Sequence, residues 1–216
     1  MASAKDIIVK PIKPAAANKL IKQIHYSGKV VPNSQLHLGV YLHGKLEGVM
    51  QFGPPINKKG TINIVADTKW NGMIELNRMA FSERLPRNSE SRAMAVAFKI
   101  IKKNYPHIEW IVSFSDATQC GDGTIYRAAG FVLTDIRRSD ALRINPETGD
   151  VMHVIQAHHK MISKEFRTWQ PTEGYQLRYV YFLNQAAKSR LTVPIIPFAK
   201  IDEVGASMYK GEKRGK

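Results

Sequence analysis

The sequence of 216 residues contains one cysteine, Cys120, so no disulfide bond can form within the chain. Such scarcity of cysteine is typical of a reducing compartment, and we expect a cytoplasmic protein. No stretch approaches the roughly 20 apolar residues of a membrane-spanning helix. The first residues, MASAKDIIVK, lack the apolar run of a signal peptide. We therefore expect neither secretion nor a location in the membrane.

Acidic residues are scarce relative to basic ones, with 18 Asp and Glu against 32 Lys and Arg and a net charge of +14. The last twelve residues, 205–216, account for only +3, which leaves +11 on the rest of the chain. A folded surface with this excess attracts polyanions. Nucleic acid is therefore the partner that the composition favours. An ordinary basic protein without such a partner is the alternative.

Internal repeats and low-complexity linkers are also absent from the sequence. Hydrophobic residues make up 44% of the chain, enough to bury a core and to argue against global disorder. We expect a single domain over residues 1–204, followed by a flexible basic tail over residues 205–216.

Patterns of apolar residues predict both strands and helices. Strands are expected over residues 5–12, 35–53 (a hairpin about His43 and Gly44), 73–81, 107–116, 131–138 and 174–183. Helices are expected over residues 14–25, 86–106 and 123–131. Alternation in the middle of the chain, with hairpins beside it, predicts an α/β (α+β) fold with one mixed sheet flanked by helices.

The ends of two predicted helices are marked by the sequence. Asn88 or Ser89 can cap the helix over residues 86–106. Asp122 can cap the helix over residues 123–131, and Gly130 suits the position just beyond its last turn.

The order of these elements is similar to that of the GNAT acyltransferases, and the piece IYRAAGF resembles the late helix of that family. A closer resemblance, from about residue 20 to residue 135, is to the Mom family of bacteriophage DNA-modification proteins. The matching blocks are QIHYSGKVVPNSQLHLGVYLHGKLEGVMQFG, LNRMAFSERLPRNSESRAMA and SFSDATQCGDGTIYRAAGF.

The Mom resemblance implies an enzyme that converts the N6 amine of adenine in double-stranded DNA to an acetamido (methylcarbamoyl) derivative. This modification shields phage DNA from host restriction enzymes, and it implies action in the cytoplasm of the infected host. Two alternatives remain open. One is a GNAT acyltransferase for a small molecule or a protein, and the other is a basic DNA-binding protein without catalytic activity.

The GNAT resemblance also implies a donor site. In that family the pyrophosphate of acyl-CoA lies against backbone N–H groups in a glycine-rich loop at a helix start. The corresponding stretch here, RLPRNSESRA, has no glycine and offers Arg87, Ser89, Ser91 and Arg92 instead. Acyl-CoA is one candidate donor, and an aminoacyl-tRNA is another. A capped helix start with solvated arginines is the structural alternative.

Two residues flank the loop within SFSDATQCGDGTIYRAAGF. Tyr126 matches the tyrosine that in GNAT enzymes protonates the departing thiolate; its alternative is a core aromatic residue with one hydrogen bond. Asp116 ends a predicted strand, at the edge where open α/β sheets gather their sites. An Asx turn or a helix cap is the alternative for Asp116.

Arg78 lies in the middle of a strand that is otherwise suited to burial. A buried guanidinium needs a carboxylate, a phosphate or a carbonyl as partner. Glu75 could supply a carboxylate, although regular alternation would put it on the opposite face of the strand. Arg78 is therefore a candidate for contact with the substrate.

The Mom family has been linked to bound iron, and His25, Tyr26 and Asp116 are the natural candidate ligands here. Imidazole, phenolate and carboxylate groups suit ferric iron. Ordinary surface or core positions are the alternative for these residues.

Basic residues late in the chain are candidates for DNA binding. They follow the predicted strand over residues 131–138 or the turn NPETGD: Arg137, Arg138, Arg143, His158, His159 and Lys160. An ordinary solvated basic surface is the alternative.

Overall fold

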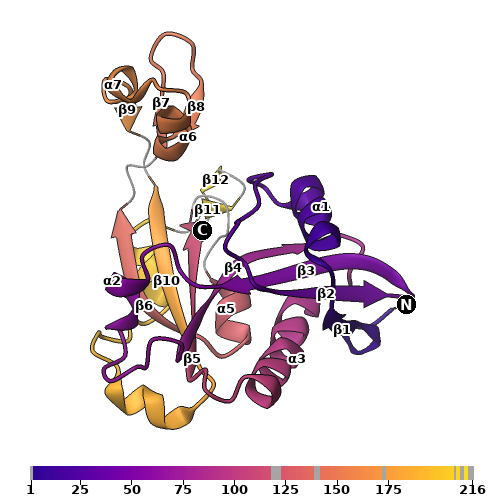
Figure 1. Cartoon of the computed structure of the whole chain (residues 1–216). Coiled ribbons are helices and arrows are strands. Elements are labelled where there is room, and N and C mark those ends of the chain that lie inside the picture. Colours follow the sequence, from indigo (N-terminus) through magenta and orange to yellow (C-terminus); the bar gives the residue numbers. More distant parts are fainter. Residues whose placement is uncertain are drawn as a thin grey trace. The chain divides into compact units, whose positions relative to one another are not determined.

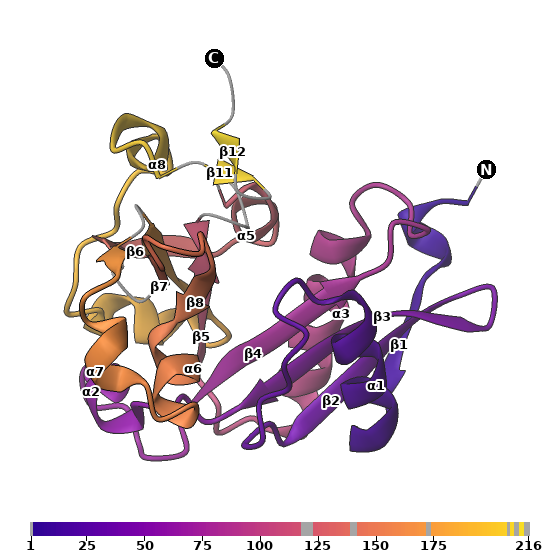
Figure 2. The same cartoon turned by 90° about the horizontal axis from the view of Figure 1, so that it is seen from above.

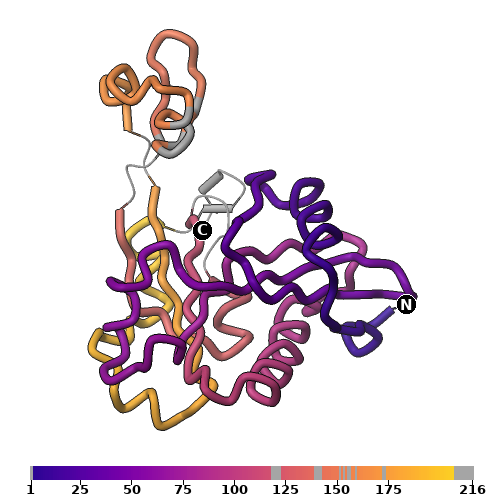
Figure 3. The backbone as a smooth tube through the Cα atoms, in the orientation of Figure 1, coloured from indigo at the N-terminus to yellow at the C-terminus, as the bar shows by residue number. Residues whose placement is uncertain are grey.

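The computed structural model describes residues 2–117, 123–138, 142–171, 174–206, 208–209 and 212–213. The chain forms two compact units, one from residues 1–114, 123–134 and 178–197 and the other from residues 115–122, 135–177 and 198–216. Figure 3 traces the backbone through both units. The expectation of a single domain over residues 1–204 with a flexible tail stays a prediction.

A seven-stranded mixed sheet organises the fold (Figure 1). Its strands, in spatial order, are β1 (Ile8–Pro11), β2 (Leu36–Leu42), β3 (Lys45–Gly53), β4 (Met73–Phe81), β5 (Trp110–Asp116), β10 (Tyr175–Phe182) and β6 (Val132–Arg138). Strands β1 to β4 are antiparallel neighbours, whereas β4 and β5 run parallel. Each of the six predicted ranges contains a strand, with two in the hairpin range, and the mixed α/β class is confirmed.

Helix α1 (Pro14–Ile24) covers one face of this sheet, and α3 (Ser89–Asn104) covers the opposite face (Figure 1 and Figure 2). Ala17 and Ile21 of α1 pack on Val49 and Ala80. Apolar residues spaced three or four apart along α3 form its buried face: Met94, Ala97, Phe98 and Ile101.

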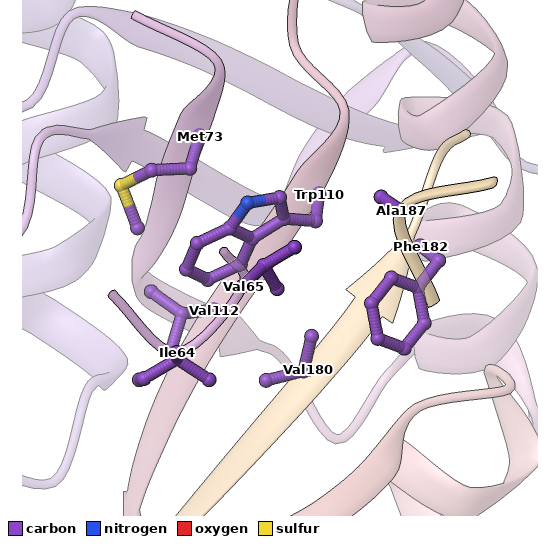
Figure 4. Close-up of a cluster of buried hydrophobic side chains, with 8 residues drawn as sticks. All are labelled: Ile64, Val65, Met73, Trp110, Val112, Val180, Phe182 and Ala187. Atoms are coloured by element: carbon purple, nitrogen blue, oxygen red, sulfur yellow. The ribbon is translucent and has the colours of Figure 1, made fainter. Parts of the chain in front are cut away.

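A second apolar cluster joins the sheet to the segment between β3 and β4 (Figure 4). Its members come from five parts of the first unit: Ile64, Val65, Met73, Trp110, Val112, Val180, Phe182 and Ala187. Trp110 is fully buried, and its indole N–H donates to Thr68 Oγ1 at 3.0 Å. The segment includes the short helix α2 (Lys58–Ile62), which the sequence did not predict.

The remaining elements are short. In the first unit these are η1 (Ala4–Asp6), α5 (Thr124–Ala128) and η2 (Gln185–Arg190). In the second unit they are β7 (Leu142–Ile144), β8 (Val151–His153), α6 (Val154–His159), α7 (Ser163–Phe166), β9 (Gln170–Pro171), α8 (Ala199–Glu203), β11 (Met208–Tyr209) and β12 (Glu212–Lys213). No helix in the described part of the chain combines the length and apolar character that crossing a bilayer requires.

Two of the three predicted helix-end positions, Asn88 and Gly130, are confirmed. Asn88 occupies the N-cap of α3 with φ +70°, but its side chain makes no capping hydrogen bond. Gly130 follows α5 with φ +85°, as predicted. Asp122 lies outside the described residues, and Gly123 is the N-cap of α5.

Gly123 has two reasons to be glycine. Its φ of +72° is left-handed, and a Cβ at this position would collide with the phenol group of Tyr179. Gly44, with φ +79°, has open space around it and so isolates the first effect.

We expect Gly44→Ala to cost about 1 kcal/mol of unfolding free energy. Gly123→Ala should lose the same amount and, because the new Cβ collides with Tyr179, about 1–3 kcal/mol more of unfolding free energy. Urea denaturation measures both, and equal losses would contradict the packing argument.

Candidate active site

Strands β4 and β5 separate partway along their length. Their parallel register covers only three pairs, Met73 with Trp110, Ile74 with Ile111 and Glu75 with Val112. Beyond these pairs β4 stays paired with β3 as far as Phe81. The backbone edges of β4 and β5 that face each other beyond Glu75 therefore open a split in the sheet.

A β-bulge in β4 lies at the start of this split. Gln51 of β3 pairs with Arg78, but the next residue, Phe52, pairs with Leu76, so Asn77 is an extra residue on β4. Such an insertion bends the strand and increases its local twist. The bulge therefore accounts for β4 turning away from β5 at this level.

The bulge also decides which side chains share a face of the sheet. Directly paired residues of neighbouring strands lie on the same face. Gln51 pairs with Arg78 and Gly53 with Glu75, and both pairs share the α1 face with Val49. Regular alternation would have put Glu75 and Arg78 on opposite faces, and the extra residue corrects that expectation.

Glu75 is a partly buried carboxyl group at this edge of the split. Burial raises its pKa to about 7, although a hydrogen bond with the Asn77 side chain and the charge of Arg78 act in the opposite direction. A carboxyl group with such a pKa exchanges a proton near neutral pH, which is the property of a general base or acid.

Arg78 finds the kind of partner that the sequence argument required. Its guanidinium donates to the carbonyl of Lys29 at 3.2 Å and to that of Asn77 at 2.8 Å. The Ser34 hydroxyl also donates to the Asn77 side chain, at 3.2 Å. Arg78 and Asn77 thus hold the loop after α1 against the bulge. Contact between Arg78 and a substrate stays a prediction.

His25, the C-cap residue of α1, lies close enough to Arg78 to feel its charge. Burial, and then the charge of Arg78, lower its pKa to about 4, so the imidazole is neutral at neutral pH. Its Nδ1 accepts from the backbone N–H of Ser27 at 3.1 Å, and its ring stacks on Tyr26 with centroids 4.3 Å apart. Tyr26 is 58% exposed.

These residues do not by themselves form a site for iron. Within the described ranges, no three His, Cys, Asp or Glu residues are grouped so that they could hold a metal ion. The positive charge of Arg78 beside His25 also disfavours a cation there. We therefore assign no step of a reaction to iron.

Ser113 lies across the split from β4. Since Val112 shares a face with Glu75, alternation directs Ser113 to the opposite face, where α3 and α5 pack. The buried Ser113 hydroxyl lies 3.1 Å from the Tyr126 hydroxyl and 3.4 Å from the Leu76 carbonyl oxygen. Ser113 thus connects the separated edge of β4 with the phenol of α5.

Tyr126 is held in place by aromatic rings as well as by Ser113. Its ring stacks on Tyr179 with centroids 4.1 Å apart and meets the edge of Phe131 at 5.3 Å. Only 8% of Tyr126 is exposed. The ring is therefore a core residue, while the hydroxyl lies beside the split. The proposed proton donation is compatible with this placement and stays a prediction.

Asp116 is the last residue of β5, the strand end that the sequence predicted for it. It is partly buried, and the neighbouring Ser115 is buried with no hydrogen-bond partner for its hydroxyl among the described residues. Cys120, further along the same loop, lies outside the described residues.

The start of α3 holds the residues predicted to bind the donor. The Ser89 hydroxyl donates to the Pro86 carbonyl at 2.6 Å, and the Ser91 hydroxyl donates to the Asn88 carbonyl at 3.2 Å. Both serines would have to release a backbone carbonyl before they could donate to a phosphate. Arg87 and Arg92 are exposed and impose no such requirement.

The basic residues predicted to bind DNA have different surroundings. Arg137 and Arg138 are exposed on β6, and the guanidinium of Arg137 lies 3.7 Å from the carboxylate of Asp135. Arg143 instead donates to the carbonyls of Arg167 and Trp169, at 2.5 and 3.3 Å, so it links three parts of the second unit.

Late in the chain, His158 and Lys160 are exposed. The side chain of His159 lies outside the described part of the structure.

Three residues beside the split were not predicted from the sequence as site residues: Glu75, Asn77 and Ser113. Glu75 and Asn77 carried a usable signal, because polar side chains are unusual in a strand that is otherwise buried. Ser113 carried none, since small polar residues are common in strands of mixed sheets.

The antiparallel strands β1 to β4, the parallel pair that splits and the helices on both faces define the GNAT acyltransferase fold. A candidate phosphinothricin N-acetyltransferase of known structure matches with a TM-score of 0.51 and 9% sequence identity, over 83% of this chain and 99% of that one.

Sequence comparison is more specific than the fold. The Mom protein family matches residues 6–200. Methylcarbamoylase mom of Escherichia phage Mu is 34% identical over 203 residues, which are 89% of this chain and 82% of the phage Mu protein. The chain belongs to the Mom protein family.

The raised pKa of Glu75 predicts a pH-dependent stability. Glu75 ionises near pH 4.5 in the unfolded chain but near pH 7 in the folded protein. Between these values the folded state binds more protons, so the unfolding free energy falls as pH rises. Glu75→Gln removes this titration while nearly preserving shape. The unfolding free energy of the wild type should therefore fall relative to that of Glu75→Gln as the pH rises. We expect the difference between the two proteins to change by about 2 kcal/mol in favour of Glu75→Gln between pH 5 and pH 8.

Urea denaturation at both pH values measures this gain. Glu147→Gln, the same replacement at an exposed position, is the control, and its difference from wild type should change little with pH. A Glu75→Gln difference that is independent of pH would show that Glu75 ionises normally in the folded state.

Proposed function

We propose that this chain is a transferase that modifies the N6 amine of adenine in double-stranded DNA. The match to the Mom protein family over residues 6–200 is the observation that carries this proposal. The phage Mu relative is named a methylcarbamoylase, and we expect the same group to be transferred here. Resistance of the modified DNA to host restriction enzymes would be the biological result.

The net charge of +14 supports a DNA substrate. The N6 amine lies within the stacked duplex, so the adenine must be extruded at a cost of a few kcal/mol. Contacts with phosphates offset that cost. The residues proposed to supply some of these contacts are Arg137, Arg138, Arg143, His158, His159 and Lys160. The guanidinium of Arg143 also donates to two carbonyls within the second unit.

The split between β4 and β5 provides the groups that the transfer requires. Glu75 and Tyr126 approach the split from opposite faces of the sheet, with Ser113 between the strands and Tyr126. The adenine amine is a weak nucleophile because its lone pair is delocalised into the ring. A base that takes its proton as the new bond forms therefore speeds the reaction.

In the proposed step, the N6 nitrogen forms a bond to a carbon of the transferred group and loses a proton to Glu75. The bond between that carbon and the donor breaks, and the leaving group takes the proton of the Tyr126 hydroxyl. Asp116 is proposed to accept a hydrogen bond from the adenine amine. Acyl transfer alone would leave an amide on N6, whereas the product that the Mom resemblance implies is an alkylated amine. Its formation therefore requires chemistry beyond that of a simple GNAT enzyme.

Removal of the acidic groups at the site tests this proposal. We expect Tyr126→Phe and Asp116→Asn each to lower adenine modification about 100-fold or more, because a positioned proton donor or acceptor contributes that much. Nucleoside mass spectrometry of DNA from cells that express each variant measures the modification.

Tyr105→Phe, the same replacement at an exposed tyrosine, is the control and should modify DNA like wild type. Thermal stability should stay near wild type in all three variants. Unmodified DNA from cells that contain folded wild-type protein would refute the function itself. Wild-type modification by a variant would instead remove that residue from the mechanism.

The donor is proposed to bind at the start of α3 through Arg87 and Arg92. If the donor is acyl-CoA, we expect the double variant Arg87→Gln/Arg92→Gln to bind acetyl-CoA about tenfold or more weakly. Each replacement removes a charged hydrogen bond between the protein and a phosphate group. Isothermal titration calorimetry with acetyl-CoA measures the affinity.

Lys102→Gln/Lys103→Gln removes two charges from the opposite end of the same helix and should bind acetyl-CoA like wild type. An absence of binding by the wild type would exclude acetyl-CoA and favour an aminoacyl-tRNA donor.

A further inference from the structure

The segment between β3 and β4, residues 54–72, exposes large apolar side chains. Ile56 is 87% exposed and Trp70 is 55% exposed, whereas Trp110 and Trp169 are buried. Tryptophan gains much from burial, so an indole held at the surface is a feature of binding surfaces.

One lysine contacts this tryptophan, and two more belong to the same segment. The Lys58 ammonium group lies 4.5 Å from the centre of the Trp70 ring, and Lys59 and Lys69 are exposed nearby in the sequence. The only acidic residue of the segment is Asp67, so its net charge is +2. We name the apolar and basic residues that this segment carries outside the core the Trp70 patch: Ile56, Lys58, Lys59, Lys69 and Trp70.

The segment that presents the Trp70 patch is anchored to the fold. The Thr68 hydroxyl accepts from the Trp110 indole and donates to the Val65 carbonyl at 2.6 Å. The backbone N–H of Gly72 donates to the Lys69 carbonyl at 2.7 Å, which closes a turn around Trp70. The exposed indole is therefore held by ordered backbone, and little conformational entropy remains to be lost on binding.

The segment covers the face of the sheet from which Glu75 approaches the split. Ile64 and Val65 pack on Met73, and Met73 shares a face with Glu75 by alternation along β4. Figure 2 shows α2 and α1 on the same side of the sheet, with α3 on the other. The segment that carries the Trp70 patch therefore packs, through Ile64 and Val65, on the face of the sheet that Glu75 also occupies.

We propose that the Trp70 patch binds double-stranded DNA, with its lysines on phosphates and the Trp70 indole stacked on an exposed base face. This inference rests on the proposed function, which requires an extruded adenine and so leaves neighbouring bases unstacked. Lysines next to an exposed aromatic ring match the two chemical features of such DNA, a polyanionic backbone and bare π faces. Lys58 can leave the indole for a phosphate when a base replaces it on the ring.

Binding of a labelled duplex oligonucleotide to the full chain tests the proposal. We expect Trp70→Ala to weaken binding about tenfold, the usual loss for one base–aromatic contact. Lys58→Ala/Lys59→Ala should reduce the slope of log affinity against log salt by about 2, one for each phosphate contact. Lys102→Ala/Lys103→Ala removes the same charge from α3, on the other face of the sheet, and should leave the slope near that of wild type.

Tryptophan fluorescence is a second measurement. Because the other two tryptophans are buried, quenching by added DNA should come from Trp70 and should disappear in Trp70→Phe. Quenching that persists in Trp70→Phe would overturn the proposal, as would wild-type affinity and salt slope in the patch variants.

The two proposals fail in different ways. If wild-type protein modifies DNA but the patch variants bind and modify it like wild type, only the Trp70 patch is wrong. If wild-type protein binds no duplex DNA, both proposals are wrong. Variants that lose binding of an RNA hairpin but retain DNA binding would assign the patch to RNA and overturn the inference.

Discussion

The extra residue in β4 is the constraint on which the rest of the site depends. Because Asn77 has no opposite residue on β3, β4 bends at this point and loses its pairing with β5 after Glu75. Backbone groups at the separated edge then need other partners, since an unpaired buried carbonyl is costly. The Ser113 hydroxyl beside the Leu76 carbonyl is one such partner, and it also reaches Tyr126. The insertion of Asn77 thus opens the split between β4 and β5, and the Ser113 hydroxyl at the split contacts the Tyr126 phenol.

The same insertion explains the electrostatics of the site. It puts Glu75 and Arg78 on one face of the sheet, where the charge of Arg78 opposes the rise in the pKa of Glu75 and adds to the fall in that of His25. Burial remains the larger cause in both cases. One carboxyl group is therefore ready to exchange a proton near pH 7, while the neighbouring imidazole stays neutral.

Positive charge in this protein does two different jobs. Arg143 and Arg78 direct their guanidinium groups at backbone carbonyls and so stabilise the fold. Lys59, Lys69, Arg137 and Arg138 are exposed and contribute to the field that attracts polyanions. Net charge alone therefore overstates how many cations are available to a nucleic acid.

Sequence alone determined the features that depend on local periodicity and turn chemistry. The bounds of β4, the inner face of α3 and the hairpin at His43 and Gly44 all follow from side-chain spacing or from turn residues. The placement of Tyr126 in a short helix and of Asp116 at the end of a strand also follows from local sequence.

Only the tertiary structure decided the bulge at Asn77, the shared face of Glu75 and Arg78, and the raised pKa of Glu75. A register shift depends on pairing with β3, and burial depends on packing by α1 and its loop, so neither is encoded in the spacing of residues along β4. Helix α2 and the exposed Trp70 were missed for a related reason. Their conformation is set by contacts of Thr68, Ile64 and Val65 with the distant β5 and β10 rather than by local propensity.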